Sequence, residues 1–143
     1  MPVSLKRIYA PASRSDGARI LVDRLWPRGL SKQRASVDRW LRDLAPSREL
    51  REWFHAHPGL WSDFRRQYLK ELARPDAEQD LRTLYSFPHH KKRLTLLFAA
   101  KDERHNNAVV LKELLDGMRK PPTGTGPGAI RAIRKQDAAM RRR

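Results

Sequence analysis

The chain has 143 residues, and its 31 Lys and Arg against 16 Asp and Glu give a formal net charge of +15. The length fits one domain, and the lack of cysteine excludes disulfides, thiolate nucleophiles and sulfur-ligated metals. Because no apolar stretch approaches the roughly 20 residues of a membrane span and no signal region opens the chain, we expect a cytoplasmic protein with no membrane partner.

Two strands are expected near the start of the chain. The first, Leu5 to Tyr9, shows an imperfect alternation of side chains with a period of two. The connection that follows contains Pro11 and an Asp16-Gly17 turn signal, and its shortness favours a hairpin. Extended, it nevertheless spans about 33 Å, which is enough for a parallel crossover, so the topology of this step stays open. An apolar run that ends at Val22 predicts the second strand.

Helical spacing of apolar residues begins after Gly29 and continues to the polar run before residue 94. A short helix is predicted by four apolar residues on one helical face, Val37, Trp40, Leu41 and Leu44. Ser47 is a suitable N-cap for the next helix, which Pro58 ends. The apolar face of that helix carries Leu50, Trp53 and Phe54.

Two longer helices are predicted next. The first opens at Ser62, and its apolar face carries Trp61, Phe64, Tyr68 and Leu72. Four basic residues of this helix are expected to face solvent, Arg65, Arg66, Lys70 and Arg74. The second helix starts with a capping box of Asp76 and Gln79 and carries Leu81, Leu84 and Tyr85. The polar run from His89 to Arg93 then leads into the next strand.

The run from Leu94 to Ala99 is apolar on both faces, which is typical of a central strand covered by helices on two sides. A helix from about Asn106 to Arg119 follows, with Ala108, Leu111, Leu115 and Met118 on its buried face. Residues 121–128 are rich in Pro and Gly and predict a linker, and residues 129–143 predict a mobile basic tail.

These elements predict a single α/β domain over residues 1–120. We expect a small, mostly parallel sheet of about three to four strands flanked by helices, with a helical insertion between the second and third strands and a basic C-terminal tail.

Positive charge is spread over the whole chain. Residues 120–143 hold seven basic side chains and one acidic side chain, so the other 24 basic and 15 acidic side chains leave a formal charge of +9 on residues 1–119. Such a field attracts phosphate-bearing partners, and nonspecific nucleic acid is a possible one. Arg outnumbers Lys by 22 to 9, however, and Arg abundance can follow genomic base composition, so the charge alone does not establish that partner.

Polar residues follow two of the predicted strands directly, at the point where each strand ends. The first set is Asp23, Arg24, Trp26 and Arg28, and the second set is Lys101, Asp102, His105 and Asn106. If the two strands are parallel neighbours, both sets converge on one crevice, which is where open α/β sheets bind ligands. The guanidinium and ammonium groups suit an anionic ligand, and the start of the following helix adds backbone N–H donors. Arg24, Trp26, Arg28, Lys101 and Asn106 are therefore the candidate ligand-binding residues.

Three residues of the crevice are candidates for acid/base catalysis, Asp23, Asp102 and His105. Histidine suits proton transfer near neutral pH, and Asp102 could orient His105. The same residues also have structural interpretations, in which Asp23 pairs with a neighbouring cation, Trp26 fills the core, Asn106 caps a helix and His105 is solvated. No metal site is predicted, because His55 and His57 are two residues apart and cannot share a helix face. The sequence names no cofactor.

From about Leu5 to Lys120 the chain resembles the family called domain of unknown function 488, in its YeaO-like branch. The resemblance rests on Asp16-Gly17, residues 21–29, Trp40, residues 45–47, Leu50, Trp53-Phe54, residues 96–97 and 99–102, and His105-Asn106. It implies a small α/β domain with a parallel sheet, which favours a crossover for the first connection. A related branch carries Cys-His-Arg after the strand equivalent to residues 94–99. This chain has no cysteine there, so thiol chemistry cannot be transferred to it.

Three functional hypotheses follow from the residues. The first is an enzyme or ligand-binding domain for a small phosphorylated or nucleotide-like molecule, with Arg24, Arg28 and Lys101 holding the anion. The second is a nucleic-acid-associated protein that binds phosphates through its basic surface and tail without strong sequence preference. The third is an interaction module in which the residues after the strands only stabilise the fold.

Overall fold

Within the part of the chain that the structure describes, the sheet has four strands, and every neighbouring pair is parallel. The computed structural model describes residues 3–91 and 93–118, without the side chains of residues 88–91. In the sheet order β1-β4-β2-β3, the strands are β1 (Val3–Arg7), β4 (Leu94–Phe98), β2 (Ala18–Leu21) and β3 (Arg39–Trp40). The helices are α1 (Lys32–Ala35), α2 (Arg48–Ala56), α3 (Trp61–Leu72), α4 (Pro75–Lys91) and α5 (Asn107–Gly117), with 3-10 turns η1 (Arg14–Asp16) and η2 (Arg42–Leu44). The predicted α/β fold with a small parallel sheet is confirmed.

Strand β4 is the centre of the sheet, as its apolar sequence predicted. All of its residues are buried, and it pairs with β1 along one side and β2 along the other. Leu96 lies opposite Leu5 of β1 and Ile20 of β2. Because β1 and β2 are parallel and separated by β4, residues 8–17 make a crossover and not a hairpin.

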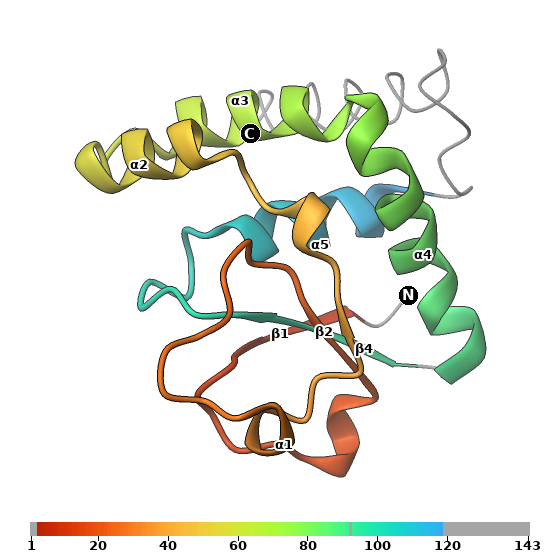
Figure 1. The fold of residues 1–143 in the computed structure, drawn as a ribbon. Coiled ribbons are helices and arrows are strands. Elements are labelled where there is room, and N and C mark those ends of the chain that lie inside the picture. The colour runs from red at the N-terminus through yellow and green to blue at the C-terminus, as the bar shows by residue number, and fades with distance from the viewer. Residues whose placement is uncertain (1–2, 92, 119–143) are drawn as a thin grey trace.

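The two faces of the sheet are covered unequally (Figure 1). Helices α3, α4 and α5 lie over one face and form the main core with it, where Ile20, Leu96 and Phe98 join Tyr68 and Leu111. The opposite face carries a smaller cluster of Ile8, Leu21, Ala35 and Leu97, against which Trp26 and Trp40 pack. The second cover therefore consists of the short helix α1 and loop residues.

The predicted helix through Val37 and Leu44 is wrong. Residues 39–40 form the edge strand β3, and the turn η2 follows it. The backbone N–H of Asp38 donates to Arg19 O at 2.8 Å, and that of Leu41 donates to Leu21 O at 2.9 Å. Pairing with the open edge of β2 thus supplies hydrogen-bond partners for the backbone of this segment. This pairing outweighs the helical spacing of the apolar side chains.

The longer helices lie where the periodicity placed them, with shifts at their ends. Ser47 caps α2 as predicted, since its side chain accepts the N–H of Leu50. Helix α3 starts at Trp61, so Ser62 lies inside the first turn. Helix α4 starts at Pro75, a residue preorganised for the first helical position, so Asp76 lies inside the helix. It continues to Lys91, so most of the predicted polar lead is helical.

Arg65 was expected in solvent but is buried, with 5% of its surface exposed. Its Nε donates to Glu113 Oε2 at 3.2 Å, which joins α3 to α5. The long Arg side chain can cross a helix interface when its charged end meets a carboxylate. An ion pair between helices therefore replaces the predicted solvent contact.

Some expectations concern residues outside the described part of the chain. The predicted linker at 121–128 and the basic tail at 129–143 both lie there, as does the predicted end of the last helix at Arg119. Among the residues that are described, no helix combines the length and the apolar character needed to cross a membrane.

Gly17 occupies a place that no other residue fits. Its φ is +67°, and a Cβ there would lie 2.5 Å from Arg93 O. The same carbonyl accepts the N–H of Ala18 at 3.1 Å, so the close approach begins the pairing of β2 with β4. Gly29 also has a positive φ of +78°, but a Cβ at that position would meet nothing within 4 Å.

We expect Gly17→Ala to destabilise the chain clearly more than Gly29→Ala. Both changes place a side chain at positive φ, which costs about 1–3 kcal/mol. Only at position 17 does the new Cβ also collide with backbone, which adds about 1–3 kcal/mol. Urea unfolding of the two variants beside the unchanged chain measures the difference, and equal losses would contradict a tight contact at Gly17.

Candidate functional site

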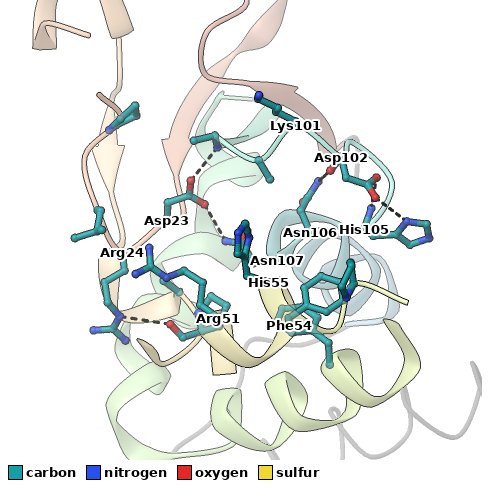
Figure 2. A pocket seen from close by; sticks show the side chains of 18 of the residues that line it. Asp23, Arg24, Arg51, Phe54, His55, Lys101, Asp102, His105, Asn106 and Asn107 are labelled. Carbon is teal, nitrogen blue, oxygen red and sulfur yellow. Dashed lines mark hydrogen bonds and ion pairs between the residues drawn. The ribbon is translucent and has the colours of Figure 1, made fainter. Parts of the chain in front are cut away.

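A cleft of about 800 Å³ lies at the carboxyl ends of β2 and β4. Its walls come from residues 23–28 after β2, from α2, and from the loop between β4 and α5 (Figure 2). The parallel pairing of β2 with β4 brings both predicted sets of residues to this edge. All eight predicted site residues line the cleft: Asp23, Arg24, Trp26, Arg28, Lys101, Asp102, His105 and Asn106.

Asp23 makes hydrogen bonds with three separate segments of the chain at the cleft. Its Oδ2 accepts the N–H of Ala99 at 2.8 Å, and its Oδ1 accepts Asn107 Nδ2 at 3.1 Å. Its backbone carbonyl accepts Trp40 Nε1 at 2.7 Å. Burial raises the pKa of Asp23 above its ordinary value of 3.8, and the bonds from Ala99 and Asn107 and the charge of Arg51 oppose this only in part.

The structural interpretation of Asp23 in the sequence named different partners. Within the described residues Asp23 makes no ion pair with Arg24, Arg28 or Lys101, and neutral N–H groups hold it instead. The charge of Arg51 compensates the Asp23 carboxylate only in part, and it does so without an ion pair. The wall of the cleft therefore carries a negative group beside its cations.

The loop after β4 is organised around Asp102. One carboxylate oxygen accepts the backbone N–H groups of Arg104 and His105 at 2.9 and 3.1 Å, and the other lies 3.0 Å from His105 Nδ1. The bond from Arg104, followed by that from the His105 side chain, lowers the pKa of Asp102. The ring of His105 also meets the edge of Trp61, with the ring centroids 5.1 Å apart. Asp102 thus contacts the ring of His105, and an acid/base role for the pair stays a prediction.

Asn106 and Trp26 have structural partners as well as places on the wall. Asn106 is the N-cap of α5, where Oδ1 accepts the N–H of Val109 and Nδ2 donates to Asp102 O. The indole of Trp26 donates to Leu30 O at 2.7 Å and packs edge-on against Trp40. The side-chain polar groups of both residues are therefore committed within the protein, and Trp26 offers the cleft an apolar surface.

The cations of the cleft have few partners. Arg24 Nε donates to Pro46 O at 3.4 Å, a long hydrogen bond. The side chains of Arg28, Arg51 and Lys101 are exposed, and none of the three has a hydrogen bond or ion pair with a described residue. Their charges are therefore available to a ligand.

Four side chains that line the cleft were not predicted as site residues from the sequence. Arg51, Phe54 and His55 lie along one face of α2, which borders the cleft, and Asn107 begins α5. Their spacing of three and four residues places the α2 residues together, but only knowledge of the tertiary packing shows that this face meets the strand ends. The sequence pointed to the start of this helix for its backbone N–H donors, whereas the side chain of Asn107 donates to Val22 and Asp23 after β2.

Metal binding finds no support in the part of the chain that is described. No three His, Asp or Glu side chains gather there in a way that could hold an ion. The cleft offers exposed cations, a half-buried carboxylate, an imidazole bonded to Asp102, and apolar walls.

Comparisons with known proteins give a family and uncharacterised relatives. The family model described as the inactive DUF488-N3 subclade matches residues 2–123. The chain is 46% identical to the uncharacterised protein YeaO of Escherichia coli (strain K12) over 115 residues, which cover 80% of this chain and 97% of YeaO. It is 37% identical over 115 residues to uncharacterised proteins of Mycobacterium bovis and Mycobacterium tuberculosis, covering 80% of this chain and 94% of each relative. No solved structure matches the chain significantly.

The raised pKa of Asp23 predicts a pH-dependent effect of Asp23→Asn on stability. An acid whose pKa is raised by folding holds its proton more tightly in the folded state, so its ionisation destabilises that state as pH rises above 3.8. We expect the unfolding free energy of Asp23→Asn minus that of the unchanged chain to increase with pH from this point and then level off.

Urea unfolding of both chains between about pH 3 and pH 8 measures this difference, and taking it between the two chains cancels the titration of the other carboxyl groups. The hydrogen bonds that asparagine cannot reproduce shift the whole curve by a constant. A difference that falls with pH would show that the pKa of Asp23 is lowered.

Proposed function

The chain belongs to the family described as the inactive DUF488-N3 subclade, and we propose that it binds a small anionic ligand, phosphorylated or nucleotide-like, in the cleft at the ends of β2 and β4. Because the family is described as inactive, the proposal concerns binding and not turnover. Acid/base roles for Asp23, Asp102 and His105 stay predictions, and so does a cytoplasmic location.

The observation that carries the proposal is the set of cations without partners around the cleft. Arg51 comes from α2 and Lys101 from the loop after β4, and Figure 2 shows them on different walls of the cleft. Arg28 adds a third exposed charge from the segment after β2. Guanidinium groups bind phosphate and carboxylate through paired hydrogen bonds, and ammonium groups add a point charge.

The walls between these cations favour a ligand that also has an apolar or flat part. Trp26, Phe54 and Phe64 line the cleft, with Pro46 and Pro58 beside them. Aromatic side chains stack with planar rings and contact apolar groups over a large area. A nucleotide-like molecule combines such a ring with a phosphate, and this combination matches the cleft.

The alternative is a nucleic-acid-associated protein that binds the phosphates of nucleic acid through its basic surface and tail. It rests on the net charge of +15, of which the tail outside the described residues holds a large share. Binding of oligonucleotides that is lost on deletion of residues 121–143, with no response to small anions, would favour this alternative.

We expect Arg51→Ala and Lys101→Ala each to weaken binding of phosphorylated ligands by about tenfold or more, because each loses a charge-assisted hydrogen bond. Both side chains are exposed and without ion pairs among the described residues, so the melting temperature of the free chain should change by only a few degrees. Calorimetric titration with inorganic phosphate and with nucleoside monophosphates measures the affinities.

Arg34→Ala is the matched control, because Arg34 is an exposed cation on α1 that does not line the cleft. This variant removes the same charge and should keep the affinity of the unchanged chain. Equal weakening by all three variants would mean that the general positive field, and not the cleft, attracts the anion.

A further inference from the structure

The cleft contains an acceptor that no described residue supplies with a donor. Asn107 is only 9% exposed and lines the cleft, and its Oδ1 accepts no hydrogen bond from any described residue. This oxygen is not among the described buried atoms that lack a partner, so it is open to the cleft and can accept from a donor outside the protein.

The orientation of this amide is determined by its neighbours. Asn107 Nδ2 donates to Val22 O at 2.9 Å and to Asp23 Oδ1 at 3.1 Å. The carbonyl of Val22 can only accept, so a flipped amide would place two acceptors in contact. Both donor hydrogens are used in this way, and only the acceptor Oδ1 remains for a ligand.

Asp23 adds further acceptor capacity next to Asn107. Each of its carboxylate oxygens accepts a single hydrogen bond from the described residues, whereas a carboxylate oxygen has room for two. Asn107 Oδ1 and the Asp23 carboxylate thus form a neighbouring pair of acceptors, which we call the acceptor pair. Figure 2 shows the two side chains pointing toward one another at the cleft.

The acceptor pair and the cations attract different parts of a ligand. An anionic group is repelled by the carboxylate of Asp23 and is attracted to the exposed cations Arg28 and Lys101, whereas the charge of Arg51 already acts in part on Asp23. The part of the ligand that reaches the acceptor pair must instead carry O–H or N–H groups. A sugar phosphate or a nucleotide has adjacent hydroxyl groups at a distance from its phosphate.

We infer that the ligand of this cleft carries a pair of vicinal sugar hydroxyls that donate to Asn107 Oδ1 and the Asp23 carboxylate, while its phosphate stays with the cations. This inference rests on the proposed function, because it concerns the same cleft. It narrows the ligand to phosphorylated sugars and ribonucleotides, and it disfavours their deoxy analogues.

The test compares ligands that differ by one hydroxyl group, using the full chain. Ribose 5-phosphate is titrated against 2-deoxyribose 5-phosphate, and AMP against 2′-deoxy-AMP, with inorganic phosphate as the anion without hydroxyl groups on a sugar. Because a site built for a hydroxyl leaves its acceptors unpaired with the deoxy analogue, we expect the hydroxylated member of a pair to bind at least about tenfold more tightly.

The outcomes separate this inference from the proposed function. Binding of a pair with equal affinity, weakened by Arg51→Ala, would overturn the inference and leave the anion site in place. Absence of binding by every phosphorylated compound would overturn both. Equal binding of AMP and 2′-deoxy-AMP without binding of either sugar phosphate would mean that the base meets the acceptor pair, which also overturns the inference.

Asn107→Ala adds a test within the protein. It removes Oδ1, so the preference for the hydroxylated member should shrink toward equality while phosphate binding persists. Since the variant also loses two hydrogen bonds to β2, its folding is checked first by thermal unfolding, and the ligand pairs on the unchanged chain decide the matter if it does not fold. An unchanged preference in a folded Asn107→Ala chain would contradict the inference.

Discussion

The carboxylate of Asp23 is the contact on which the architecture of the cleft depends. It holds the N–H of Ala99 at the end of β4 and the side chain of Asn107 at the start of α5, while its own backbone carbonyl holds Trp40. Three segments far apart in the chain therefore meet at one residue. The pKa of Asp23 is raised because its carboxylate is partly buried at this junction, and the neutral donors compensate the loss of hydration incompletely.

The position of the site could be predicted from the sequence because strand ends are visible in it. The apolar runs stop at Val22 and Ala99, charged residues follow each, and a parallel sheet brings such ends together. The parallel course of the first connection was open from the residues and followed from the family resemblance. Helices α2 and α3 were predicted from periodicity, since a buried apolar face governs both.

The predictions that were wrong or incomplete share one cause, which is contacts between elements that are far apart in the sequence. Trp40 has helical spacing relative to its neighbours, but the open edge of β2 takes the backbone into a strand. Arg65 has the charge of a surface residue, but Glu113 on another helix allows it to be buried. The side chains of Arg51 and Asn107 were not predicted to line the cleft for the same reason. Their place in the cleft depends on which elements α2 and α5 pack against, and not on the local sequence pattern.

The order of strands in the sheet also constrains how the chain can fold. The first two strands do not touch each other, and both pair with β4, which begins at residue 94. During synthesis, neither β1 nor the β4 side of β2 has a partner until that late segment leaves the ribosome. Long-range pairing of this kind slows folding and leaves strand edges open in the meantime. The central strand is thus the last part of the sheet to be synthesised, and the nascent chain must keep two unpaired strands apart from other chains until then.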